Sequence, residues 1–170
     1  MRAVMTIGVA AMALAAGPAW GQTADCQYIA NAMAAAPKFL GFRGAADPGN
    51  NMADGVDNGT WKATRSLPGT QCRIQRYNPD SGMVTSYHCE WDSASPKAFH
   101  FRLGDITKFV RSCPQWKIGR TEVISSTNHI LYTTDNRYAF IVYWEPEAMI
   151  TLEVARAADV KAVMAASPPD

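Results

Sequence analysis

The sequence predicts an α+β fold in which an antiparallel sheet is built from two meanders, each preceded by a helix, with a short C-terminal helix and disulfide cross-links. Two separate stretches repeat apolar residues at helical spacing, and each is followed by short segments rich in β-branched and aromatic residues. Four cysteines follow a leader that is typical of export, so they are expected to pair.

The leader has three parts. Arg2 is followed by an apolar run over 3–16 and then by small residues up to Gly21. A charged start, a short apolar middle and a small-residue end are features of a cleaved export signal, and the run is too short to span a bilayer. We therefore expect 1–21 to be a signal peptide and 22–170 to be a single, soluble α+β domain, periplasmic or secreted and without a transmembrane anchor.

The charge balance excludes one class of partner. The chain carries 16 Lys+Arg and 15 Asp+Glu, and removal of Arg2 with the leader would bring the formal net charge to zero. Nucleic acids and anionic membranes are bound by a basic surplus, which is missing here. We expect no nucleic-acid partner and no cofactor.

The first helix is expected to begin at Asp25, a residue that favours the N-cap, and to end before Pro37. Its apolar residues at helical spacing are Tyr28, Ile29, Ala32, Met33 and Ala36.

A long loop is expected over 43–59, which is rich in turn formers and has no apolar period. Loops of this length are often functional or disordered. Its oxygen-bearing residues suggest calcium, but an EF-hand needs oxygen ligands at loop positions 1, 3 and 5, and Met52 or Val56 occupies position 3 in the two frames. A solvated loop is the favoured interpretation.

The first meander is expected to contain strands over 61–66, 72–77 and 83–89. A loop of 79–82 closing the last two would place Cys72 directly opposite Cys89, within disulfide reach. The other bond would then join Cys26 to Cys113 and so connect the two helices. This connectivity depends on the register, since a shift of one residue would turn both hairpin cysteines apart.

A metal site is the competing interpretation of Cys72, Cys89, His88 and His100. Structural zinc sites bring their ligands in closely spaced pairs such as C-x₂₋₄-C, and the sequence contains none. We therefore predict no metal.

The second helix is expected to start at Ser95-Pro96 and to stop at Pro114. Its apolar positions are Phe99, Leu103, Ile106, Val110 and Cys113. The strand-like segments that follow are 115–120, 122–126, 129–134, 137–144 and 148–155, with a turn at Asp135-Asn136 and a last helix over 159–166.

The segments 61–66 and 116–121 share the pattern W-K-x-x-R-[ST]. Duplication of a helix-plus-meander unit would explain the match, as would two strands that both begin with tryptophan.

No catalytic motif is present: the sequence lacks G-x-S-x-G, H-E-x-x-H, S-x-x-K and a glycine-rich phosphate loop. The alternative to a binding protein is a small hydrolase-like enzyme that assembles its site from distant residues. Its candidates are His88, His100 or His129 with a carboxylate such as Asp105 or Glu122.

The strand over 137–144 is apolar on both faces, so one of its rows should point away from the helices unless a further helix or a curled sheet covers it. Exposed tyrosine and tryptophan are typical anchors of protein interfaces. We therefore predict an exported, non-catalytic binding protein of the inhibitor, immunity or envelope-interaction type, which meets a protein or envelope partner through this face and the 43–59 loop. The candidate partner-binding residues are Tyr138, Phe140, Tyr143, Trp144, Asp54 and Asp57.

Overall fold

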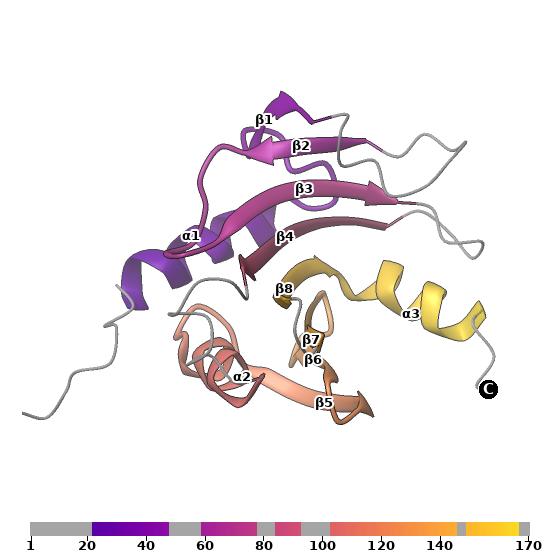
Figure 1. Cartoon of the computed structure of the whole chain (residues 1–170). Coiled ribbons are helices and arrows are strands. Elements are labelled where there is room, and N and C mark those ends of the chain that lie inside the picture. Colours follow the sequence, from indigo (N-terminus) through magenta and orange to yellow (C-terminus); the bar gives the residue numbers. More distant parts are fainter. Residues whose placement is uncertain (1–21, 48–58, 78–83, 93–102, 146–148, 167–170) are drawn as a thin grey trace, which may run out of the picture.

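The computed structural model describes residues 22–47, 59–77, 84–92, 103–145 and 149–166. Within these residues, three helices accompany eight antiparallel strands in one sheet, whose spatial order is β1-β2-β3-β4-β8-β7-β6-β5 (Figure 1). The predicted α+β fold is confirmed. Among the described helices, none has both the length and the apolar character needed to cross a bilayer.

Each half of the chain is a helix followed by a four-stranded meander. The first half consists of α1 (Gln22–Ala35), β1 (Arg43–Ala46), β2 (Thr60–Ala63), β3 (Gln71–Tyr77) and β4 (Val84–Asp92). The second half consists of α2 (Leu103–Ser112), β5 (Ile118–Ser125), β6 (Asn128–Thr133), β7 (Tyr138–Glu145) and β8 (Met149–Arg156), and α3 (Ala157–Ala166) follows it. The halves join where the last strands of the two meanders, β4 and β8, pair antiparallel.

This arrangement repeats the helix-plus-meander order that a duplication would produce, but the short sequence match does not align the halves. Trp61 lies within β2, the second strand of its meander, whereas Trp116 precedes β5, the first strand of the other. The two tryptophans therefore occupy different positions in the two units.

Helix α1 begins before Asp25, so the N-cap prediction for this residue is wrong. The Asp25 carboxylate is buried and forms an ion pair with Arg65 at 3.0 Å. The carboxylate therefore connects the first turn of α1 to the segment between β2 and β3.

The 43–59 segment contains a strand that the sequence did not indicate. Arg43 pairs with Ala63 and Ala46 with Trp61, so β1 extends the sheet beyond β2. Its small, largely exposed residues show no alternation, and a Cβ on Gly44 would lie 2.9 Å from the carbonyl oxygen of Lys62. Close backbone approach rather than side-chain burial thus defines this strand.

Residues 48–58, with the candidates Asp54 and Asp57 and the central part of the possible calcium loop, lie outside the described residues. The expected start of the second helix at Ser95-Pro96 also lies outside them, while the helix ends before Pro114 as predicted.

The two segments 115–120 and 122–126, expected as separate strands, are replaced by one strand, β5. A register shift between Ile118 and Arg120 marks a bulge that lets the strand continue past Gly119.

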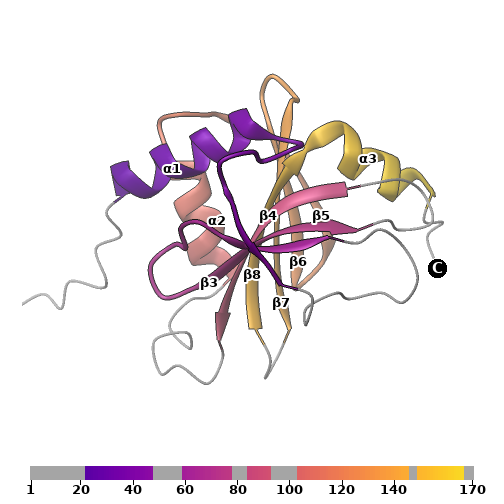
Figure 2. The same ribbon diagram turned by 90° about the horizontal axis from the view of Figure 1, so that it is seen from above.

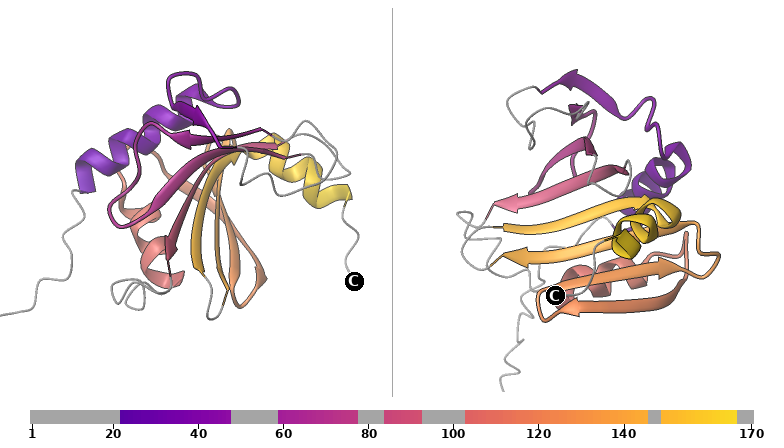
Figure 3. Two further views of the ribbon diagram at one scale, coloured as in Figure 1. Left: turned by 45° about the horizontal axis from the view of Figure 1, so that its top comes forward. Right: turned by 90° about the vertical axis from the view of Figure 1, so that its right-hand side faces the viewer.

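The main core lies between the sheet and the pair α1 and α2. Its fully buried members include Ile29, Ile106, Val110, Leu131, Phe140 and Leu152. On the opposite face α3 covers a second, smaller cluster with Ile130, Tyr132, Ala139, Ala155 and Val160 (Figures 2 and 3). The row of β7 that contains Ala139 and Ile141 is therefore partly covered by α3. Such cover by a helix is the alternative to an open recognition face.

Both disulfides join the pairs that the hairpin register predicts. Cys72 lies directly opposite Cys89, with their Cα atoms 4.1 Å apart. Cys26 is bonded to Cys113, with Cα atoms 5.5 Å apart, which attaches α1 to the residue after α2. The metal hypothesis for Cys72 and Cys89 is therefore wrong, and within the described ranges no group of three or more His, Cys, Asp or Glu side chains could hold a metal ion.

Candidate functional site

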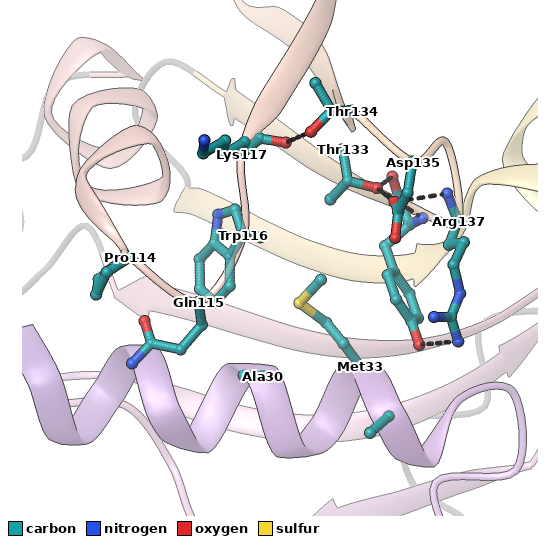
Figure 4. Close-up of a pocket in the computed structure, with 12 residues that line it drawn as sticks. Ala30, Met33, Pro114, Gln115, Trp116, Lys117, Thr133, Thr134, Asp135 and Arg137 are labelled. Atoms are coloured by element: carbon teal, nitrogen blue, oxygen red, sulfur yellow. Dashed lines mark hydrogen bonds between the residues drawn. The ribbon is translucent and has the colours of Figure 1, made fainter.

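A groove of about 430 Å³ lies where the two halves of the chain meet. One wall is the C-terminal part of α1, and the other walls are the 114–117 link and the turn between β6 and β7 (Figure 4). Its volume is within the range of about 300–1,000 Å³ that is common for ligand pockets.

The Cys26–Cys113 bond positions the first two walls, because the 114–117 link leaves the bonded residue directly. Trp116 is fixed within this link: its Nε1 donates a hydrogen bond to the carbonyl oxygen of Val110 at 2.8 Å, and its ring packs at 5.0 Å from that of Phe140. With its only donor used, Trp116 can offer a ligand its ring surface and no hydrogen bond.

The third wall is a tight turn. The Thr133 hydroxyl donates to Asp135 Oδ1 at 2.6 Å, and the backbone N–H of Arg137 donates to the same oxygen at 3.1 Å. The hydrogen bond from Thr133, aided by that from Arg137, holds the pKa of Asp135 below its usual value. The Asp135 carboxylate is thus charged and engaged in holding the turn.

The turn and the link are bound to each other. The Lys117 carbonyl oxygen accepts hydrogen bonds from the backbone N–H of Thr134 at 2.8 Å and from its hydroxyl at 3.1 Å. Two walls of the groove therefore form one hydrogen-bonded unit, and α1 is attached to it by the disulfide.

Polar and apolar groups share the lining of the groove, and its exposed charges are the cations of Lys117 and Arg137 and the carboxylate of Asp135. Met33, Trp116 and Tyr138 provide the apolar surface, and the exposed residues Lys117 and Arg137 lie at the rim. The Arg137 guanidinium lies 5.4 Å from the centre of the Tyr138 ring, and neither rim cation is in a salt bridge within the described part of the chain.

Gln115 adds a polar group to the groove. Its Oε1 is buried and has no hydrogen-bond partner among the described residues. Because the atom is buried, a ligand in the groove does not reach it in this conformation.

The predicted partner-binding residues fall in different environments. Tyr138 is half-buried and lines the groove. Phe140 is fully buried beneath α2 and so presents no surface to a partner, because its row of β7 packs into the main core. Tyr143 is half-buried, and the Trp144 side chain lies outside the described part of the structure.

A second cluster, the His88 network, lies in the middle of the sheet. Nδ1 of His88 is 3.1 Å from Glu153 Oε1, and Nε2 is 2.7 Å from Glu90 Oε1. Arg73 on β3 forms an ion pair with the same oxygen of Glu90. His88 is only 2% exposed, and it pairs with Glu153 across the junction of β4 and β8.

This geometry favours the protonated form of His88. Burial alone would lower the pKa of His88, but the carboxylates of Glu153 and Glu90 beside its two ring nitrogens outweigh burial and raise it. Burial would raise the pKa of Glu90, and the bonds from His88 with the nearby charge of Arg73 lower it instead. A general base needs a free ring nitrogen within reach of a substrate, and both nitrogens of His88 face carboxylates.

His88 therefore lends no support to the enzyme alternative. The carboxylates beside His88 are not those named from the sequence: Glu122 accepts from the Tyr132 hydroxyl at 3.1 Å and pairs with Arg120 at 2.7 Å, and Asp105 lies on the exposed side of α2. His100 is outside the described residues.

Trp116, Lys117, Arg137 and Gln115 were not expected at a site. The tryptophan and the aromatic-rich strand that starts at Tyr138 were recognised in the sequence, but nothing in it places them beside α1.

A comparison of the chain with protein-family models, curated proteins and solved structures finds no match to any of the three.

Proposed function

We propose that this is an exported binding protein that holds an extended segment of a protein partner in the groove between α1 and the β6–β7 turn. The observation that carries the proposal is the combination in one groove of aromatic side chains with two cations, Lys117 and Arg137, that are in no salt bridge among the described residues. Asp135 is the single carboxylate in the described lining, so the groove keeps a net positive charge. Aromatic residues, Met and Arg are the types enriched at the centres of protein interfaces.

The lining of the groove specifies the chemistry of that segment. Trp116 and Tyr138 would contact an apolar side chain, and the rim cations Lys117 and Arg137 would meet an acidic side chain or a terminal carboxylate. A peptide with an apolar residue beside an acidic one supplies both groups.

The compartment supports an extracytoplasmic partner. Both cysteine pairs are oxidised, and disulfides persist in the periplasm and outside the cell. Together with the predicted leader, they favour a partner in the envelope or the medium.

The test is retention of a partner from envelope extract by the immobilised, oxidised chain of residues 22–170. The variant Lys117→Glu with Arg137→Glu reverses the rim charge, and Lys108→Glu, an exposed position on α2 outside the groove, is the matched control. Wild type and control should retain one protein in equal amount, while the double variant should lose it.

If the double variant still retained that protein, the binding surface would have to lie outside the groove. A wild-type chain that retains nothing would contradict the proposed function itself.

A further inference from the structure

Strand β5 forms one end of the sheet and pairs only with β6 among the described strands. Its register with β6 is regular from Arg120 to Val123, and irregularities flank this run on both sides. The outer side of this run therefore presents backbone donors and acceptors along an ordered, short edge.

Apolar side chains are exposed on the same strand. Val123 is 65% exposed and Ile124 is 45% exposed. Of the large hydrophobic residues that are exposed in the described ranges, these two are the only adjacent pair. Their place at a sheet edge is where a further strand would cover them.

The charges on this edge are held in fixed positions. Arg120 and Glu122 are two residues apart, so they point to the same face, and their side chains are paired at 2.7 Å. Both also contact Tyr132 on β6: the guanidinium of Arg120 lies 4.7 Å from the ring centre, and the hydroxyl donates to Glu122.

We propose that two copies of the protein pair through β5, antiparallel, about a two-fold axis at Thr121, so that the two sheets become continuous. In this register Arg120 lies opposite Glu122 of the partner subunit, and Glu122 lies opposite Arg120 of the partner subunit. Directly opposed side chains in an antiparallel pair are close enough for such contacts.

The order of the charges along β5 indicates that the strand that pairs with it is β5 of a second copy. A two-fold interface requires a surface that complements itself, and the pattern Arg-x-Glu read against its own reverse places opposite charges together twice. A strand with two like charges would repel its copy. The bulges at both ends of the regular run limit the pairing to a short segment, which gives a closed dimer and opposes growth by further edge pairing.

Sedimentation equilibrium of the oxidised chain of residues 22–170 tests this pairing with four proteins: wild type, Arg120→Glu, Glu122→Arg and the double swap. Wild type should show a concentration-dependent dimer. Each single variant places like charges opposite each other at two contacts and should raise the dimer dissociation constant by about tenfold or more. The swap restores opposite charges and should restore the dimer.

Circular dichroism and the melting temperature separate dimer loss from unfolding, since the single variants also lose the pair within one chain. Val123→Lys is a second route, because a residue this exposed can be changed without opening the core. It should give a folded monomer. A wild-type chain that is monomeric at every concentration, or single variants that dimerise as wild type does, would overturn the proposal.

Discussion

Tyr138 and Phe140 lie two residues apart on β7 and point to the same face of the sheet. Phe140 is completely buried and packs against the Trp116 ring, whereas Tyr138 is half-buried and reaches the groove. One row of side chains therefore runs from the core into the proposed binding surface. Phe140 stabilises the core, and Tyr138 is available to a partner.

This contrast predicts that one alanine substitution mainly lowers stability and the other mainly weakens binding. Phe140→Ala removes a fully buried ring and should lower the free energy of unfolding by about 3–5 kcal/mol. Tyr138→Ala should leave most of the stability and weaken retention of the partner. Denaturant unfolding and partner retention, measured on the same samples, check both; a Tyr138→Ala protein that is folded and binds like wild type would exclude Tyr138 from the interface.

His88 shows how a buried ionisable residue can be structural. The raised pKa of His88 means that the folded state binds the proton more tightly than the unfolded state. The stability that His88 contributes is therefore complete below about pH 6.5 and is lost as the pH rises through the folded-state pKa. The lowered pKa of Glu90 affects the acidic side of the stability profile. The stability that Glu90 contributes is complete above about pH 4.5 and is lost as the pH falls through the folded-state pKa.

We therefore expect the free energy of unfolding to be highest between about pH 4.5 and 6.5. His88→Gln should lower it in this window and flatten its decline on the alkaline side, because the group that loses its proton is absent. Urea unfolding from pH 4 to pH 9 measures both curves, and an equal alkaline decline in the two proteins would show that His88 is not its cause.

At the scale of the elements, the register of the β3–β4 hairpin was predictable from its turn residues, and with it both disulfides. That register also places Arg73 opposite His88. The pairing of His88 with Glu153 could not be predicted, because it depends on which strands of the two meanders meet. Strand β1 was missed for another reason: its exposed small residues carry no alternating pattern.

The two disulfides should differ in their contribution to stability. They close loops of sequence separation 17 for Cys72–Cys89 and 87 for Cys26–Cys113. In the chain-entropy model the shorter loop is worth roughly 3 kcal/mol and the longer about 4.5 kcal/mol. Replacing each cysteine pair by alanines and comparing the free energies of unfolding tests whether Cys26–Cys113 contributes more than Cys72–Cys89.

Only loss of Cys26–Cys113 should also weaken partner retention, since this bond attaches α1 to the link that carries Trp116. A Cys72→Ala, Cys89→Ala protein serves as its control, and equal loss of binding in both would mean that general stability controls the groove.

At the scale of the whole molecule, the groove belongs to neither half alone. Met33 comes from α1 in the first half, and Trp116 and Arg137 come from the second. Helical and strand periods predict each element from its own residues, but they carry no information on how one meander meets the other. The α+β class and the two units were therefore accessible from the sequence, and the groove was not.

Site-specific photo-crosslinking shows whether a protein partner lies in this groove. Ala34 and Asn31 are both exposed on α1, but only Ala34 lines the groove. With a photoreactive amino acid at each position in turn, we expect a cross-link to one envelope or secreted protein from Ala34 and none from Asn31. Equal cross-linking from both positions, or none from Ala34 while the partner is retained, would contradict it.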